Sequence, residues 1–208
     1  MRTTPDVFGF GLLDAVPQST ILALADPEDA DGDGISRRVN RFFDGRVGRF
    51  GRKALTPTLA EFAEGAFHFE QGVTVPNVLG EGTVGGQRNG GAHRRLRSAP
   101  APAAPRKLDD TAKRGQQRFA SIGCAPGHVP TLRTGDHPIE ALVATPSEFR
   151  TEPLVALRLA RRYRHDGRAG SIEQAIRLHG GEATRSRDAF AALSESDRKA
   201  LVGFLESL

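Results

Sequence analysis

The segment at residues 80–107 constrains the fold most, because it divides the chain into two blocks. Its composition shifts to Gly, Arg, Ala and Pro, and its apolar residues follow no regular period. Such a segment buries too little apolar area to offset the loss of chain entropy on folding. We therefore expect a flexible linker here, with a helical segment at residues 1–79 before it and a second domain at residues 108–208 after it.

The linker also explains the basic character of the chain. The formal net charge is +4, yet residues 82–108 carry six cationic side chains and no acidic one: Arg88, Arg94, Arg95, Arg97, Arg106 and Lys107. The rest of the chain is therefore net acidic. A nucleic-acid or anionic-surface contact through the linker is an alternative, but the segment holds no aromatic residue on which a base could stack. Nucleic acid is not the partner that we expect.

The first block predicts short helices joined by turns. Ser19 is a candidate N-cap for a helix over residues 20–25. Thr56-Pro57 is a candidate start for a second helix, in which apolar side chains at helical spacing share one face: Leu59, Phe62, Ala63, Ala66 and Phe67. A stripe of this kind is typical of a helix that packs on a small core.

The second block predicts at least three helices. The first has the apolar stripe Leu108, Ala112, Gly115, Phe119 and Ile122 and ends at Gly123-Cys124. Ser171 and Gln174 form a capping box for a helix with Ile172, Ala175, Ile176 and His179 on one face, which Gly180-Gly181 stops. A capping box at Ser194 and Asp197 opens the last helix, which carries Leu201, Val202, Leu205 and Leu208. With no internal repeat and no convincing strand pair, the predicted class is mainly α.

Two further features limit the location of the protein. No apolar run is long enough to cross a membrane, and 26% of the residues are charged. Residues 1–14 lack the pattern of a signal peptide, because Pro5, Asp6 and two glycines interrupt the apolar stretch. We expect no membrane span.

The single cysteine, Cys124, excludes an intrachain disulfide framework and a Cys-rich zinc site. It begins the run Cys124-Ala-Pro-Gly-His128, which keeps the Cys and His of the haem-attachment motif Cys-x-x-Cys-His but has Gly127 at the second thiol. In that motif two thiols bond the porphyrin and the adjacent imidazole reaches the iron. The alternative is a small structural thiol beside a loop histidine.

Four blocks of the sequence resemble the di-haem oxidoreductases, a cytochrome c peroxidase-like family. They are FGFGLLDAVPQSTILALADPEDADGDGISRRVNRF at residues 8–42, CAPGHVPTLRTGDHPI at 124–139, HDGRAGSIEQAIRLHGGEA at 165–183 and LSESDRKALVGFLESL at 193–208. The blocks together hold 86 of the 208 residues and occur in the family's order. Residues 124–139 resemble the second haem-binding segment of the family.

The resemblance implies a cytochrome c-like haem domain, preceded by a small helical, loop-rich segment. It implies His128 as the proximal iron ligand and a distal ligand from the helix before the last one, a role that His179 fits. The apolar face that carries His179 agrees, since a neutral imidazole there can approach a buried iron. Ligation by both histidines favours electron transfer over peroxide binding. The alternative for His179 is a core histidine that donates to a backbone carbonyl.

The resemblance also implies neighbours for the haem, a partner and a compartment. The carbonyl of Pro130 is a candidate to orient the imidazole of His128, and His165 and Arg168 are candidates to pair with the haem propionates. The implied partner is an electron donor or acceptor protein, and the implied location is the periplasm.

The chain departs from the family in its thiols. Without a thiol at position 127, haem c can form at most one thioether, through Cys124. A second haem motif cannot be built within this chain, because it has no second cysteine. Enzymatic activity is therefore left open, and no catalytic residue is assigned. The alternative function is a haem-free, non-catalytic remnant that acts as a structural or interaction domain.

An acidic loop in the first block is a candidate calcium site. Asp29, Asp31 and Asp33 alternate with small residues and are followed by Gly34, as in the first half of an EF-hand loop. The twelfth position of that loop is Asn40 and not a bidentate Glu. Asp26, Ser36 and backbone carbonyls are candidates to complete the site, and a solvated acidic turn is the alternative.

Overall fold

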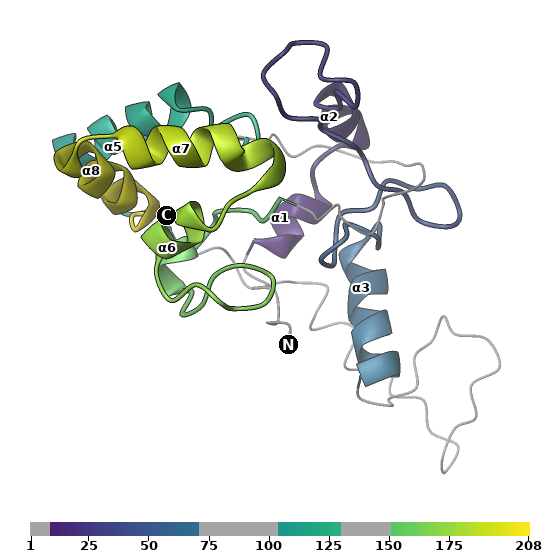
Figure 1. The fold of residues 1–208 in the computed structure, drawn as a ribbon. Helices are drawn as coiled ribbons and strands as arrows, with labels where there is room; N and C mark the ends of the chain where they lie inside the picture. The colour runs from purple at the N-terminus through teal and green to yellow at the C-terminus, as the bar shows by residue number, and fades with distance from the viewer. Residues whose placement is uncertain (1–8, 71–103, 130–150) are drawn as a thin grey trace.

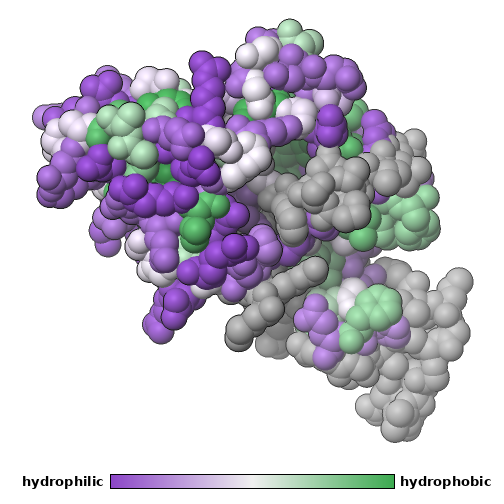
Figure 2. Space-filling model, in the orientation of Figure 1, coloured by the Kyte–Doolittle hydropathy of each residue, from purple (hydrophilic) through white to green (hydrophobic). Residues whose placement is uncertain are grey.

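The computed structural model describes residues 9–70, 104–129 and 151–208, and within these ranges the protein is helical and forms only isolated β-bridges. The predicted mainly α class is confirmed. In Figure 1, α5 to α8 gather on one side of the molecule, α2 and α3 lie on the other, and α1 lies between them. The surface over the C-terminal helices is largely hydrophilic (Figure 2). No described helix is long and apolar enough to cross a membrane.

The first part consists of short helices and long turns. Helix α1 spans Phe10–Asp14, α2 spans Gln18–Ala23 and α3 spans Leu59–Gly65, after which η1 continues over Ala66–Glu70. Both predicted starts were wrong. Helix α2 begins directly after Pro17, whose fixed φ suits an N-cap, and α3 begins after Thr58, whose hydroxyl accepts a hydrogen bond from the amide of Glu61.

Aromatic packing holds this part together. Phe10, Phe50 and Leu59 are buried, and Leu13 and Phe62 pack against them. The rings of Phe10 and Phe50 lie 5.2 Å apart between centroids. The guanidinium of buried Arg49 donates to the carbonyls of Leu13 and Asp14 at 3.0 and 2.9 Å. Arg49 thereby satisfies carbonyls at the end of α1 that have no partner within the helix.

The core of the second part lies between α5 and α8. Helix α5 spans Asp110–Ser121 and α8 spans Glu195–Leu205, and side chains of Asp109 and Ser194 cap them, as the sequence pattern indicated for α8. The buried core cluster is Ala112, Phe119, Ile172, Phe190, Leu201, Phe204 and Leu205. The predicted apolar stripes of both helices therefore face the core.

Between α5 and α8 the chain forms α6 over Ile172–Arg177, η3 over Leu157–Leu159, η4 over Gly181–Ala183 and α7 over Thr184–Ala192. Ser171 caps α6 as predicted, accepting from the amide of Gln174, but the Gln174 side chain accepts from Gly170 and not from Ser171. No sequence pattern predicted α7. This helix lacks a capping side chain and buries only Phe190, so its sequence carries neither a start signal nor a full apolar stripe.

Several contacts join distant segments. The amide of Arg106 donates to the carbonyl of Ser207 at 2.8 Å, so the last residues of the predicted linker contact the C-terminal end of the chain. A salt bridge of 2.6 Å joins Arg52 to Glu152. Most of the predicted linker, including the boundary at residue 79, lies outside the described residues.

Candidate functional site

Helix α5 delivers Cys124 and His128 to one side of the core. The chain turns at Gly123, where φ is +84°, and the carbonyl of Gly123 accepts a hydrogen bond of 2.8 Å from Ser186. A Cβ at this position would lie 3.0 Å from that hydroxyl. Glycine is therefore favoured here by both backbone and space. The amide of His128 then donates to the carbonyl of Cys124 at 2.9 Å, which fixes the turn between the two residues.

The imidazole of His128 is largely removed from water. It lies against Phe119, with 6.4 Å between ring centroids, and its Nδ1 atom is buried without a hydrogen-bond partner. Burial, together with a smaller effect of the neighbouring His179, lowers the pKa of His128 to about 4, and a hydrogen bond with a backbone group of Glu152 partly opposes both effects. The ring is therefore neutral near pH 7 and keeps a lone pair.

His179 lies just beyond α6, where its Nδ1 is 2.7 Å from the carbonyl oxygen of Ala175. Because a carbonyl only accepts, Nδ1 carries the proton, and the neutral ring has its lone pair on Nε2. The family resemblance implied a distal ligand on the helix before the last one. The structure places α7 between His179 and α8, so that location was wrong, although the residue itself reaches the same space as His128.

The two imidazoles face one cavity, with 6.4 Å between ring centroids and 63° between ring planes. The cavity has a volume of about 870 Å³. One part of its wall is apolar and comes from residues including Phe10, Phe119, Leu157, Ile172, Ile176, Leu201 and Leu205. Another part is charged, with the four arginines Arg52, Arg162, Arg164 and Arg187 outnumbering the two carboxylates of Glu152 and Glu182, and His165 lies in the same wall. The cavity thus combines apolar walls with positive charge, as a flat apolar ligand with acidic groups requires.

The spacing of the histidines fits the iron of the expected haem. A metal ion about 2 Å from one nitrogen of each ring, with the ring centres about 1 Å further out, separates the centres by roughly 6 Å. The measured 6.4 Å agrees with this value. The donor set also fits, because imidazole is a common axial ligand of haem iron.

Cys124 lines the same cavity. Its side chain packs against the core cluster, and burial raises the pKa of its thiol to about 11. Gly127 lines the cavity as well, and a Cβ there would meet only the carbonyl oxygen of Cys124 at 3.9 Å. Since the φ of Gly127 is not in the left-handed region, neither space nor backbone requires glycine at this position.

Of the other predicted neighbours of the haem, one lines the cavity and one does not. His165 lines the cavity, whereas Arg168 does not, and its guanidinium forms a salt bridge of 2.5 Å with Asp166. Pro130 lies outside the described residues. Four arginines of the cavity wall were not predicted from the sequence: Arg52, Arg162, Arg164 and Arg187. They come from separate segments, and only the adjacency of Arg164 to His165 in sequence could have indicated one of them.

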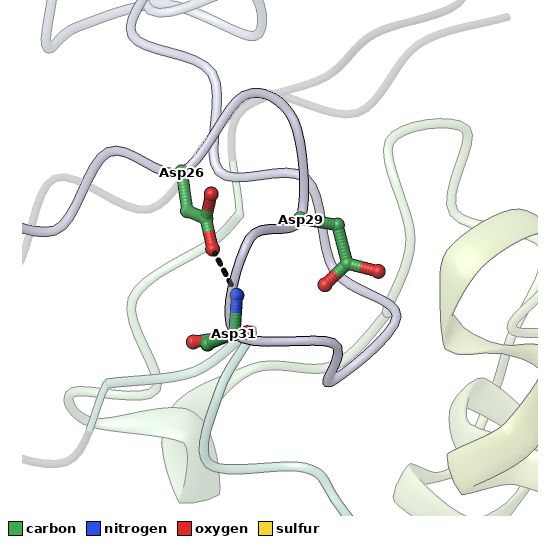
Figure 3. Close-up of side chains that lie close together, drawn as sticks. All are labelled: Asp26, Asp29 and Asp31. Carbon is green, nitrogen blue, oxygen red and sulfur yellow. Dashed lines mark hydrogen bonds between the residues drawn. The ribbon is translucent and has the colours of Figure 1, made fainter.

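Backbone amides of the acidic loop already donate hydrogen bonds to its carboxylates. Oxygens of Asp26, Asp29 and Asp31 lie within 4.8 Å of one another, a different trio from the predicted Asp29, Asp31 and Asp33. The Asp26 carboxylate accepts from the amides of Ala30 and Asp31, and Figure 3 shows the second of these bonds. These amides are the main cause of the lowered pKa of Asp26.

A cationic side chain already pairs with carboxylates of this loop. Arg37 forms salt bridges with Asp31 and with Asp33, the latter at 2.6 Å, and lies 3.6 Å from Asp26. The hydrogen bond from Arg37 is the main cause of the lowered pKa of Asp33. The guanidinium thus lies where the negative charge of the loop would otherwise attract a cation.

Comparison with protein families gives one match. A family model described as "Di-haem oxidoreductase, putative peroxidase" matches residues 1–93 and 140–208, which is more than half of the chain. The matched residues include His165, His179 and the acidic loop, and they leave out 94–139, which contain Cys124 and His128. No curated protein and no solved structure matches the chain.

Proposed function

Because the chain belongs to the di-haem oxidoreductase family, we propose that it is a haem-binding electron-transfer or peroxidase-like oxidoreductase domain that holds one haem between His128 and His179. The observation that carries this proposal is the pair of imidazoles, 6.4 Å apart, across an apolar cavity. The predicted cytochrome c-like architecture of residues 108–208 belongs to the same proposal, as does the helical segment at residues 1–79 before it.

Each residue of the cavity has a task in this proposal. When bound, haem supplies an iron that exchanges one electron. The imidazoles of His128 and His179 would hold the iron, and ligation by both favours electron transfer over peroxide binding. The arginines of the cavity wall neutralise the propionates. The apolar wall excludes water from the ring.

Cys124 is the proposed attachment point of haem c. Only one thioether can form, because position 127 offers no thiol. The proposed partner is an electron donor or acceptor protein, and the proposed location is the periplasm, where c-type haem is attached.

The test is expression with c-type maturation machinery. We expect a Soret band in the purified protein and a pyridine haemochrome spectrum with the band position of one thioether. A folded protein that carries no haem under these conditions would overturn the proposal. It would favour the second candidate, a haem-free interaction domain, for which the specific observation is a core cluster in which Phe190 and Leu201 are buried among protein side chains.

Calcium binding by the acidic loop is a separate proposal. Carboxylates of Asp29, Asp31 and Asp33 are the predicted ligands, and the ion would have to displace Arg37 from Asp31 and Asp33. We expect calcium to stabilise Arg37→Gln more than the unmodified protein, because the substitution removes the competing charge. Thermal unfolding with and without millimolar calcium measures this. No shift in either protein would exclude the site.

A further inference from the structure

We infer that this cavity takes up haem without covalent attachment, through the imidazoles of His128 and His179 alone, so that Cys124 is not needed for binding. The inference rests on the proposed function, since it concerns the same site. It differs from the family resemblance, which implies haem held through thioether bonds.

Protein contacts already hold the imidazoles of His128 and His179 in place. The ring of His179 is fixed by the 2.7 Å contact of Nδ1 with the Ala175 carbonyl, and its own carbonyl accepts from Arg187 at 3.1 Å. The ring of His128 lies against Phe119, and its amide donates to the carbonyl of Cys124. Ligands that are ordered before binding lose little entropy when they bind, so no covalent tether is needed to position them.

One ring nitrogen of each histidine lacks a competing partner, while a backbone group of Glu152 bonds to the His128 ring and the Ala175 carbonyl bonds to the His179 ring. Nε2 of His179 is the unprotonated nitrogen once Nδ1 donates to Ala175. Among the described residues His128 is the only histidine with a buried ring nitrogen that has no hydrogen-bond partner. A buried polar atom without a partner costs free energy. Ligation through Nδ1 of His128 and Nε2 of His179 therefore displaces neither of these hydrogen bonds.

The Cys124 thiol forms only a small part of the surface that would contact haem. Cys124 contributes one half-buried side chain packed against the core, and Gly127 contributes none. The binding surface consists instead of the apolar and cationic walls of the 870 Å³ cavity. Apolar burial of a haem-sized ring and two metal–imidazole bonds are independent of the thiol.

The test uses the full chain produced without maturation machinery and titrated with free haemin. We expect uptake of one haemin per chain, a low-spin spectrum typical of two imidazole ligands, and a rise in Tm. Cys124→Ala is expected to bind as the unmodified protein does. His128→Ala and His179→Ala are expected to lose the low-spin spectrum, and added imidazole is expected to restore it if the variant is folded. His68→Ala, outside the cavity, is the matched control.

The outcomes separate the two claims. If the matured protein carries haem but the haem-free protein takes up no haemin, the inference is wrong and the proposed function stands. If Cys124→Ala binds haemin more than about tenfold more weakly, or about 1.4 kcal/mol, the thiol contributes and the inference is wrong. If neither preparation binds haem, both claims fail. If His68→Ala loses the low-spin spectrum as the cavity variants do, the ligands are not those named here.

Discussion

At the scale of single residues, burial keeps two side chains of the cavity in their neutral forms. It lowers the pKa of His128 to about 4 and raises that of Cys124 to about 11. Both shifts arise because removal from water disfavours the charged form of either group. A neutral imidazole can ligate a metal, whereas a neutral thiol is a poor nucleophile. The environment therefore favours ligation by His128 over reaction of Cys124.

The buried imidazole predicts a pH dependence of stability in the haem-free protein. The pKa of His128 is lower in the folded state than its ordinary value of 6.5, so the unfolded chain binds more protons as the pH falls from 6.5 towards 4. Stability should fall in this window by up to about 3 kcal/mol. Urea unfolding at pH 7, 5.5 and 4.5 measures it. His128→Gln should lose this part of the dependence, and equal slopes for both proteins would contradict the pKa shift.

Substitution of Gly127 by cysteine is expected to add a second thioether bond between the protein and haem. Because a Cβ fits at this position, Gly127→Cys should fold as the unmodified protein does and complete the Cys-x-x-Cys-His motif. After maturation, its pyridine haemochrome band should move from the position of one thioether to that of two. Gly127→Ser is the control, since it adds a side chain of similar size without the thiol. A band that does not move would show that position 127 lies out of reach of the vinyl group.

At the scale of helices, the site depends on the close approach of α5 and α8. A Cβ added to Gly115 of α5 would lie 1.9 Å from the carbonyl oxygen of Ala200 in α8. The helices can come this close only because position 115 has no side chain. Their contact places the end of α5, and with it Gly123 and Cys124, beside the core. The stripe pattern predicted that Gly115 faces the core, but not that another backbone lies against it.

Gly115→Ala should destabilise the protein by about 1–3 kcal/mol or more, because backbone atoms of α8 must move. Gly203→Ala is the matched control. It lies within α8, nothing lies within 4 Å of the added Cβ, and the substitution should be neutral or stabilise by up to about 1 kcal/mol. Urea unfolding of both variants decides. Equal effects would show that α5 and α8 pack less closely than described.

At the scale of the whole molecule, the cavity is built from distant segments. Phe10, Ile35 and Arg52 of the first part line it together with α5, α6 and α8 of the second. The salt bridge between Arg52 and Glu152 joins the two parts at the cavity wall. The predicted linker divides the sequence into two blocks, but residues from both blocks line the cavity.

This arrangement predicts which arginine affects haem retention. Arg52→Ala should weaken haemin binding by about tenfold, because it removes a cation from the cavity wall and the contact with Glu152. Arg168→Ala should leave binding unchanged, because Arg168 is exposed and does not line the cavity. Haemin titration of both variants measures the difference. A larger effect at Arg168 would support its sequence-based assignment to the propionates instead.

The sequence by itself determined the mainly α class, the apolar stripes of α5 and α8, the caps at Ser171 and Ser194, and the family. These features depend on residues close together in the chain, where helical spacing and capping act locally. Local patterns did not predict α7, because this helix lacks a capping side chain and a full apolar stripe. They also placed the start of α3 at Thr56-Pro57, whereas Thr58 is its N-cap.

Only the tertiary structure decided how the site is assembled. It placed His128 and His179 across one cavity, gave His179 its tautomer through Ala175, brought Arg52 to the wall and left Arg168 outside it. It also placed Arg37 against the acidic loop. These relations join residues that are distant in sequence. They follow from which surfaces pack together and which charges that packing leaves in contact, and no local pattern of residues encodes them.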